Sequence, residues 1–164
     1  MIAEMEMLTE LMATKCPVEK RAVTNHRALN EAFDYKRPSS FSRGMRIDLD
    51  GLVILLISGT ASINEHGQIV HIGDFRAQMQ RTLSNITLLL EAEGATWHDI
   101  VRTTCYLRDI ERDYAAFNEE RTVFYKAHQL DPLPASTGIQ AILCFPELLI
   151  EIEAIAMFRV DKKK

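Results

Sequence analysis

The chain has 164 residues, of which 47% are hydrophobic and 26% charged, and these values indicate one globular domain with its own core. The formal net charge is −4 and the one basic run is the closing DKKK, which argues against a nucleic-acid-binding surface. The apolar stretches are too short to cross a bilayer and no stretch resembles a signal peptide, so we expect a cytoplasmic protein without a membrane partner.

The first part of the chain, residues 1–37, is expected to be an N-terminal extension that is partly helical. Within it, apolar residues recur at helical spacing at Met5, Leu8, Leu11 and Met12. The main domain is expected to span 38–160, followed by a disordered basic tail at 161–164.

The main domain shows strand and helix patterns in alternation. Asp50-Gly51 separates two apolar runs and predicts a hairpin, while Asp74 and Gly94 bracket a helical stripe as start and stop signals. Asp109 or Asp113 could cap a second helix. The expected elements, in chain order, are two strands within 45–58, a helix at 74–93, a strand at 99–107, a helix ending near 129, and strands at 136–143 and 148–157.

This order, β-β-α-β-α-β-β, predicts an α+β fold with a single mixed sheet and two helices on one face. The segments LVILLIS and LLIEIEAIAM, however, carry apolar residues on both faces. Two helices can cover only one face, so we expect a homo-oligomer to cover the other.

Two carboxylates interrupt the last strand. Side chains alternate along a strand, so Glu151 and Glu153 share one face with Leu149 and Ile155, opposite the wholly apolar face. Carboxylates roughly 7 Å apart in a partly dry interface raise each other's pKa, and a carboxyl poised in this way can exchange a proton with a substrate. An ion pair with Arg102 or Arg108 is the structural alternative.

Several motifs, in order and spacing, carry a resemblance to a known family. They are PSSFSRG, LLISGTAS, RTLSNITLLLEAEGATWHDIVRTTCYLRDI, YAAFNEERTVFY, LPAS and IEIEAIAM. Over roughly Ser39 to Met157 the chain resembles the Rid family (YjgF/UK114 proteins), the reactive intermediate imine/enamine deaminases. The resemblance implies a chorismate-mutase-like homotrimer with a central barrel and ligand clefts between subunits.

The resemblance also implies a chemistry, the hydrolysis of a small-molecule enamine or imine such as 2-aminoacrylate to a keto acid and ammonia, without metal or organic cofactor. Glu151 matches the glutamate that positions or activates water, and Asn118 matches an asparagine bordering the cleft. Ser58 and Gly59 match the cleft-lining strand end. Without the resemblance, Ser58-Gly59 could be a simple turn and Asn118 could bond within its helix.

Four cleft positions depart from the family pattern. Ser136 replaces the arginine that holds the substrate carboxylate, and a hydroxyl offers neither the charge nor the two-pronged geometry of a guanidinium, a loss of about 2–3 kcal/mol. Phe41 replaces a tyrosine, Thr60 a glutamine and Gly138 a cysteine. Because the scaffold motifs are intact, these changes indicate a redesigned pocket.

Further candidates lie around this pocket. SGTASI followed by VHIGD is also similar to the catalytic domain of chorismatases, whose last-strand glutamate serves as the acid. Cys144 is expected on the strand face of Ser136 and either lines the cleft or packs as a small residue. Arg43 or Arg102 could supply an anion anchor, and His71 a second proton carrier.

The remaining cysteines and histidines predict no metal site. Cys16, Cys105 and Cys144 are odd in number and lack metal-ligand or disulfide spacing. The leading hypothesis is therefore a homotrimeric deaminase-type hydrolase with Glu151, assisted by Glu153, as the acid/base. The alternatives are a non-catalytic ligand- or partner-binding trimer and a chorismatase-like hydrolase.

Overall fold

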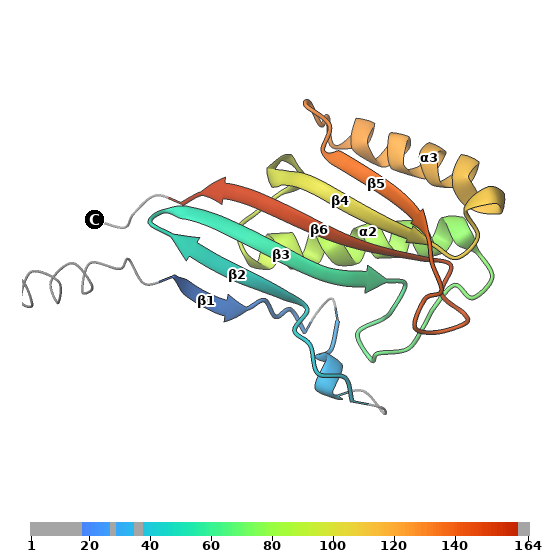
Figure 1. Cartoon of the computed structure of the whole chain (residues 1–164), viewed down its shortest axis with the longest axis horizontal. Helices are drawn as coiled ribbons and strands as arrows, with labels where there is room; N and C mark the ends of the chain where they lie inside the picture. Colours follow the sequence, from blue (N-terminus) through green and yellow to red (C-terminus); the bar gives the residue numbers. More distant parts are fainter. Residues whose placement is uncertain (1–17, 27–28, 35–37, 161–164) are drawn as a thin grey trace, which may run out of the picture.

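A computed structural model describes residues 18–26, 29–34 and 38–160, and its described part is one mixed sheet with two long helices (Figure 1). The strands are β1 Glu19–Ala22, β2 Gly44–Leu49, β3 Leu52–Ala61, β4 Ile100–Leu107, β5 Ala135–Gln140 and β6 Ile150–Arg159. The helices are α2 Phe75–Ala92 and α3 Ile110–Ala127. From β2 onward the order agrees with the sequence prediction.

The sheet has the strand order β1-β2-β3-β6-β4-β5, and neighbours are antiparallel except for the parallel pair β4 and β5. A parallel pair needs a crossover connection, which α3 supplies. The hairpin between β2 and β3 turns at Asp50 and Gly51, both with positive φ (50° and 85°), as a type I′ turn requires.

Both helices begin at a capping aspartate. Asp74 accepts a hydrogen bond from the backbone N–H of Ala77 at 3.0 Å, and Asp109 accepts one from that of Arg112 at 3.0 Å. Helix α2 ends at Ala92 with Glu93 as its C-cap, and Gly94 follows in the left-handed region at φ 73°. Asp109, not the alternative Asp113, therefore starts the second helix.

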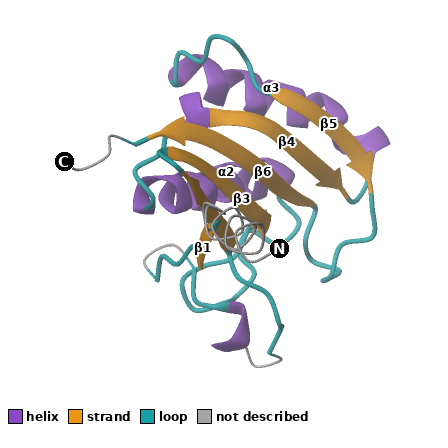
Figure 2. Cartoon of the chain, turned by 60° about the vertical axis from the view of Figure 1, so that its left-hand side comes forward, coloured by secondary structure: helices purple, strands orange, loops and turns teal. Residues whose placement is uncertain are grey.

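Helices α2 and α3 lie on the same side of the sheet, and no long helix of the described residues covers its other face (Figures 1 and 2). Alternate residues of β3 and β6 are buried against them, among them Val53, Leu55, Ile150 and Ile152. The opposite face, which we call the open face, carries an apolar patch along the paired strands β2, β3 and β6. Its members are Met45, Ile47, Ile54, Leu56, Ile155 and Met157.

One strand was not predicted from the sequence. Residues 19–22, within the expected extension, form β1 and pair with β2. The strand is short and exposed along its length, and its sequence EKRA carries no apolar alternation, so no pattern marked it. The helical piece predicted at Met5–Met12 lies outside the described residues.

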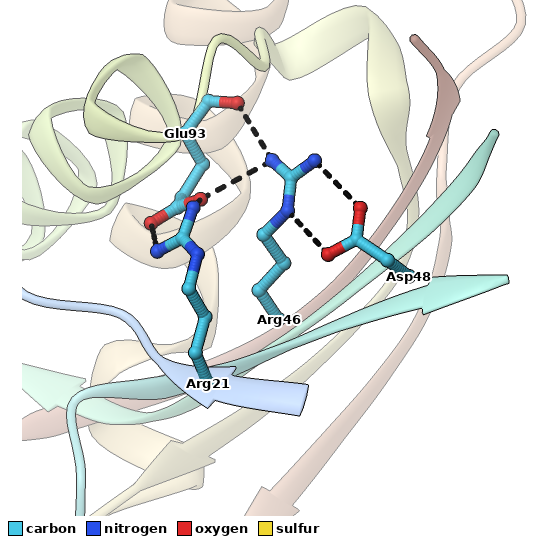
Figure 3. Close-up of polar contacts among 4 residues, drawn as sticks. All are labelled: Arg21, Arg46, Asp48 and Glu93. Atoms are coloured by element: carbon cyan, nitrogen blue, oxygen red, sulfur yellow. Dashed lines mark hydrogen bonds and ion pairs between the residues drawn. The ribbon is translucent and has the colours of Figure 1, made fainter. Parts of the chain in front are cut away.

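A charged network joins this added strand to the helix layer (Figure 3). Glu93, whose side chain is 3% exposed, accepts two hydrogen bonds from Arg21 of β1, at 2.8 and 2.5 Å. It also accepts one from Arg46 of β2 at 3.3 Å, and Arg46 in turn donates two bonds to Asp48 at 2.9 and 2.8 Å. Glu93 therefore links the first two strands to the end of α2.

Replacing Glu93 by glutamine should lower the free energy of unfolding by about 1–3 kcal/mol, because two arginines lose a buried charged acceptor. Urea unfolding at constant chain concentration measures the change. As a control, Glu119→Gln removes an exposed partner of Arg76 and should cost below about 1 kcal/mol. If both variants lowered the free energy of unfolding equally, Glu93 would stabilise the fold no more than an exposed ion-pair partner does.

Candidate functional site

A cavity of about 460 Å³ lies beside the last strand and gathers most of the candidate residues. Its size is that of a small-molecule site. Its walls come from the segment before β2, the end of β3, the loop before β6, and β6 itself. The lining includes Phe41, Arg43, Ser58, Gly59, Cys144, Glu151 and Glu153.

The end of β3 is shaped by a β-bulge. Ile57 pairs with Ala154 and Thr60 with Ile152, so that Ser58 and Gly59 together oppose the single residue Glu153. The Ser58 hydroxyl donates to the carbonyl of Ser42 at 2.8 Å, which fixes the bulge against the segment before β2. Thr60, a candidate site residue, is turned out of the cavity, is buried, and donates to the carbonyl of Ser58 at 2.9 Å.

Gly59 makes room for the carboxylate of Glu151. A Cβ at this position would collide with the carboxylate oxygen Oε1 of Glu151. Any side chain here would therefore push Glu151 away from its present position. The glycine leaves the space that the Glu151 carboxylate occupies, a role that goes beyond the turn suggested by the sequence.

Glu151 is a partly buried acid beside a second acid. Burial, followed by the charge of Glu153, raises the pKa of Glu151 above its ordinary value. Tyr106 is the cross-strand partner of Glu151, and partial burial together with its hydrogen bond to Glu153 raises the pKa of its phenol. The direction for Glu151 is the one predicted from the sequence.

Neither arginine proposed as an ion-pair partner neutralises Glu151. Arg108 donates to the carbonyls of Leu148 and Phe145, each at 2.6 Å, and so holds the loop that precedes β6. Arg102 donates to the Thr137 hydroxyl at 3.1 Å. In the described part of the chain, no basic side chain forms an ion pair with Glu151.

Two other cavity residues differ from the sequence predictions, Arg43 in its role and Cys144 in the element that carries it. Arg43 is buried and donates to the carbonyl of Asn30 at 2.9 and 2.7 Å, so its guanidinium helps hold the segment that precedes β2. Cys144 was expected on the strand of Ser136, but β5 ends at Gln140. Cys144 lies instead in the following loop, where it is exposed and lines the cavity.

The remaining candidates lie apart from Glu151, on the helix side of the sheet. Ser136 accepts hydrogen bonds from Thr103 at 3.0 Å and from Arg121 of α3 at 3.1 Å. Arg121 also donates to the side-chain oxygen of Asn118 at 2.6 Å. Gly138 follows on the same strand face and has open space where a Cβ would be. We call Asn118, Arg121 and Ser136 the α3–β5 cluster.

Sequence reasoning missed two residues of these sites. Arg121 follows Asn118 by three positions, which places both on one helix face, and that spacing was a usable signal. Tyr106 could be placed beside Glu151 only once the register of β4 against β6 was known. His71, the suggested proton carrier, is exposed, has positive φ (60°) and is not among the residues lining the cavity of Glu151.

Comparison with known proteins places the chain in a family. A family model described as endoribonuclease L-PSP matches residues 36–158, most of the chain. The chain belongs to this family. It is the Rid (YjgF/RutC) family whose motifs the sequence carries, so the resemblance is confirmed.

Two curated relatives are about a third identical to this chain over the residues that align. A RutC family protein of Pyrococcus abyssi is 35% identical over 103 residues, which cover 62% of this chain and 76% of that protein. A RutC family protein of Haemophilus influenzae is 34% identical over 112 residues, covering 68% and 82%.

Solved structures of Rid-family proteins share the fold. The YjgF gene product of E. coli superposes with a TM-score of 0.67 at 28% identity, covering 85% of this chain and 99% of that one. E. coli TdcF, solved with bound serine, gives 0.68 at 25%, covering 84% and 98%. The expected α+β fold is thus confirmed.

Two kinds of feature are absent from the described residues. No helix among them has the length and apolar character needed to cross a bilayer. Within the same residues, no group of three or more histidine, cysteine, aspartate or glutamate side chains is placed to hold a metal ion.

The raised pKa of Glu151 predicts a pH-dependent stability. The folded chain binds this proton more tightly than the unfolded chain, so the free energy of unfolding falls as pH rises from the ordinary value of 4.5 through the raised one. Glu151→Gln should therefore be more stable than wild type at pH 8 but not at pH 4. Urea unfolding at both pH values measures this difference.

The matched control is Glu147→Gln, which changes an exposed acid in the loop before β6. It should show no such crossover. If Glu151→Gln changed the free energy of unfolding equally at pH 4 and pH 8, the pKa of the Glu151 carboxyl would not be raised in the folded chain.

Proposed function

We propose that this protein is a Rid-type hydrolase that converts a small enamine or imine to the corresponding keto compound and ammonia, with Glu151 as acid/base. The observation that carries the proposal is a carboxyl in a ligand-sized cavity, with a raised pKa and no ion-pair partner in the described chain. A group with its pKa moved toward neutrality can both accept and donate a proton in one cycle.

The chemistry assigns Glu151 two proton transfers. An enamine gains a proton on carbon from solvent and becomes the iminium ion, whose carbon is then attacked by water. As the carboxylate, Glu151 takes a proton from that water, which gives the carbinolamine. As the carboxyl, it returns the proton to nitrogen. The C–N bond then breaks, ammonia leaves, and the hydroxyl proton passes to solvent as the carbonyl forms. Tyr106 and Glu153 border this carboxyl, and the charge of Glu153 contributes to its raised pKa.

The complete site is proposed to form between subunits. Within one chain Glu151 lies on the open face, whereas the α3–β5 cluster lies on the helix side, so the two sets are separated by the sheet. Each set would meet the other set of a neighbouring subunit in a homotrimer whose centre is closed by the apolar patch of the open face. The half-exposed Leu56 and Met157 of that patch, 41% and 39% exposed, support this assembly.

Glu151→Gln should reduce ammonia release by about 10²- to 10⁴-fold, the usual contribution of an acid/base group. The assay generates 2-aminoacrylate in situ, tests ring-derived aminodienoates in parallel, and detects ammonia against buffer. Glu147→Gln serves as the control and should keep wild-type activity. If folded wild type matches buffer for every substrate, the deaminase assignment is lost.

A non-catalytic binding protein is the second candidate, favoured by the absence of the family arginine at Ser136. The two functions differ in one readout, because a binder is stabilised by a ligand that it never converts. A thermal-shift screen of the same compounds, followed by product analysis of each one that stabilises the protein, separates them.

The trimer predicts a native mass three times that of the 18.7 kDa chain. Leu56→Arg places a charge on the open face and should reduce the mass to that of the single chain, whereas Val123→Arg, at a 67% exposed position of α3, should not. Native mass spectrometry of the three proteins tests this. A monomeric wild type would remove the proposed intersubunit site.

A further inference from the structure

The helix side of the sheet carries an arginine in a fixed position. The Arg121 guanidinium lies over the Phe117 ring, with 4.5 Å from Cζ to the ring centroid. Its Nη2 donates to Asn118 at 2.6 Å and its Nη1 to the Ser136 hydroxyl at 3.1 Å. Helix α3 and strand β5 thus hold the group from two sides.

The partners of Arg121 are all neutral. Several other arginines are paired with carboxylates, as Arg46 is with Asp48, Arg76 with Glu120 and Arg112 with Asp113. Arg121 has no such ion pair among the described residues. Among the arginines that donate to neutral groups, Arg121 is set apart because it lines a cavity together with apolar side chains of α3 and of the segment before β5. A guanidinium has five N–H donors, and the two bonds to Asn118 and Ser136 leave donors and the full charge available for an anion.

A cavity of about 540 Å³ lies against this guanidinium. Its walls combine apolar side chains with polar and charged ones. They include Leu130, Leu133, Pro134, Tyr125 and Lys126, together with Asp131. The combination of a cationic fork and an apolar wall suits a small molecule with one carboxylate and a short hydrocarbon body.

We propose that Arg121 is the carboxylate anchor of the substrate site, acting from helix α3 beside the strand position where Ser136 stands. Asn118 and Ser136 are its positioning residues, because each accepts one of its N–H groups. The inference deepens the proposed function, on which its substrate role rests, and it defines the substrate class as small carboxylates. It explains how a chain with serine at position 136 can still recognise an acid.

The experiment compares binding of a carboxylate and a matched neutral molecule. Isothermal titration of pyruvate, the keto acid formed from 2-aminoacrylate, is set against titration of pyruvamide. In wild type the acid should bind more tightly than the amide. Arg121→Gln should weaken pyruvate binding about 10- to 100-fold and leave pyruvamide unchanged, and Arg121→Lys should fall between them.

Two further variants test the placement. Arg112→Gln removes a charge from the same helix away from Ser136 and should bind pyruvate as wild type does. Adding Ser136→Arg to Arg121→Gln should restore pyruvate binding, because the cation returns to the same locality from the strand. In turnover assays, Arg121→Gln should raise KM for carboxylate substrates more than it lowers kcat.

The outcomes separate this inference from the proposed function. Wild-type pyruvate affinity in folded Arg121→Gln, an equal loss in Arg112→Gln, or no preference of wild type for pyruvate over pyruvamide would overturn the anchor. Arg121-dependent binding of pyruvate without ammonia release from any substrate would keep the anchor and reject the hydrolase. Ammonia release that depends on Glu151 but not on Arg121 would keep the hydrolase and reject the anchor.

Discussion

Strand β6 packs on the helices with one face and forms part of the open face with the other, and the candidate site follows from that constraint. Ile150, Ile152 and Ala154 are buried against the helices, so the residues between them must point to the open face. Glu151 and Glu153 occupy those places, partly buried and close to each other. In its described part the chain offers no ion-pair partner for Glu151, so the pKa of that carboxyl is set by its burial and by the charge of Glu153.

Three neighbouring features leave these carboxylates both space and freedom from a positive charge. The bulge at Ser58-Gly59 opens space where any side chain would displace Glu151. Arg108 is occupied by backbone carbonyls and holds the loop that leads into β6. On the other side of the sheet the positive charge comes from α3 through Arg121, so acid and cation are kept apart within one chain and cannot neutralise each other.

The sequence predicted the elements well because each has a local cause. Short stretches of chain determine the helix caps at Asp74 and Asp109, the turn at Asp50-Gly51, and the strand alternation through Glu151. What it missed depends on register and tertiary contact. Strand β1 has no pattern of its own, Cys144 is placed by the end of β5, and Arg121 reaches Ser136 only through the packing of α3 on β5.

The family match begins at residue 36, but the folding unit begins earlier. Strand β1 covers the edge of β2, and Arg21 contributes two of the hydrogen bonds that satisfy Glu93. A chain trimmed to the region of similarity would expose the edge of β2, and an exposed strand edge is a template for aggregation. It would also leave the buried Glu93 without the two hydrogen bonds that Arg21 donates. The boundary of shared ancestry is therefore a poor place to cut this protein.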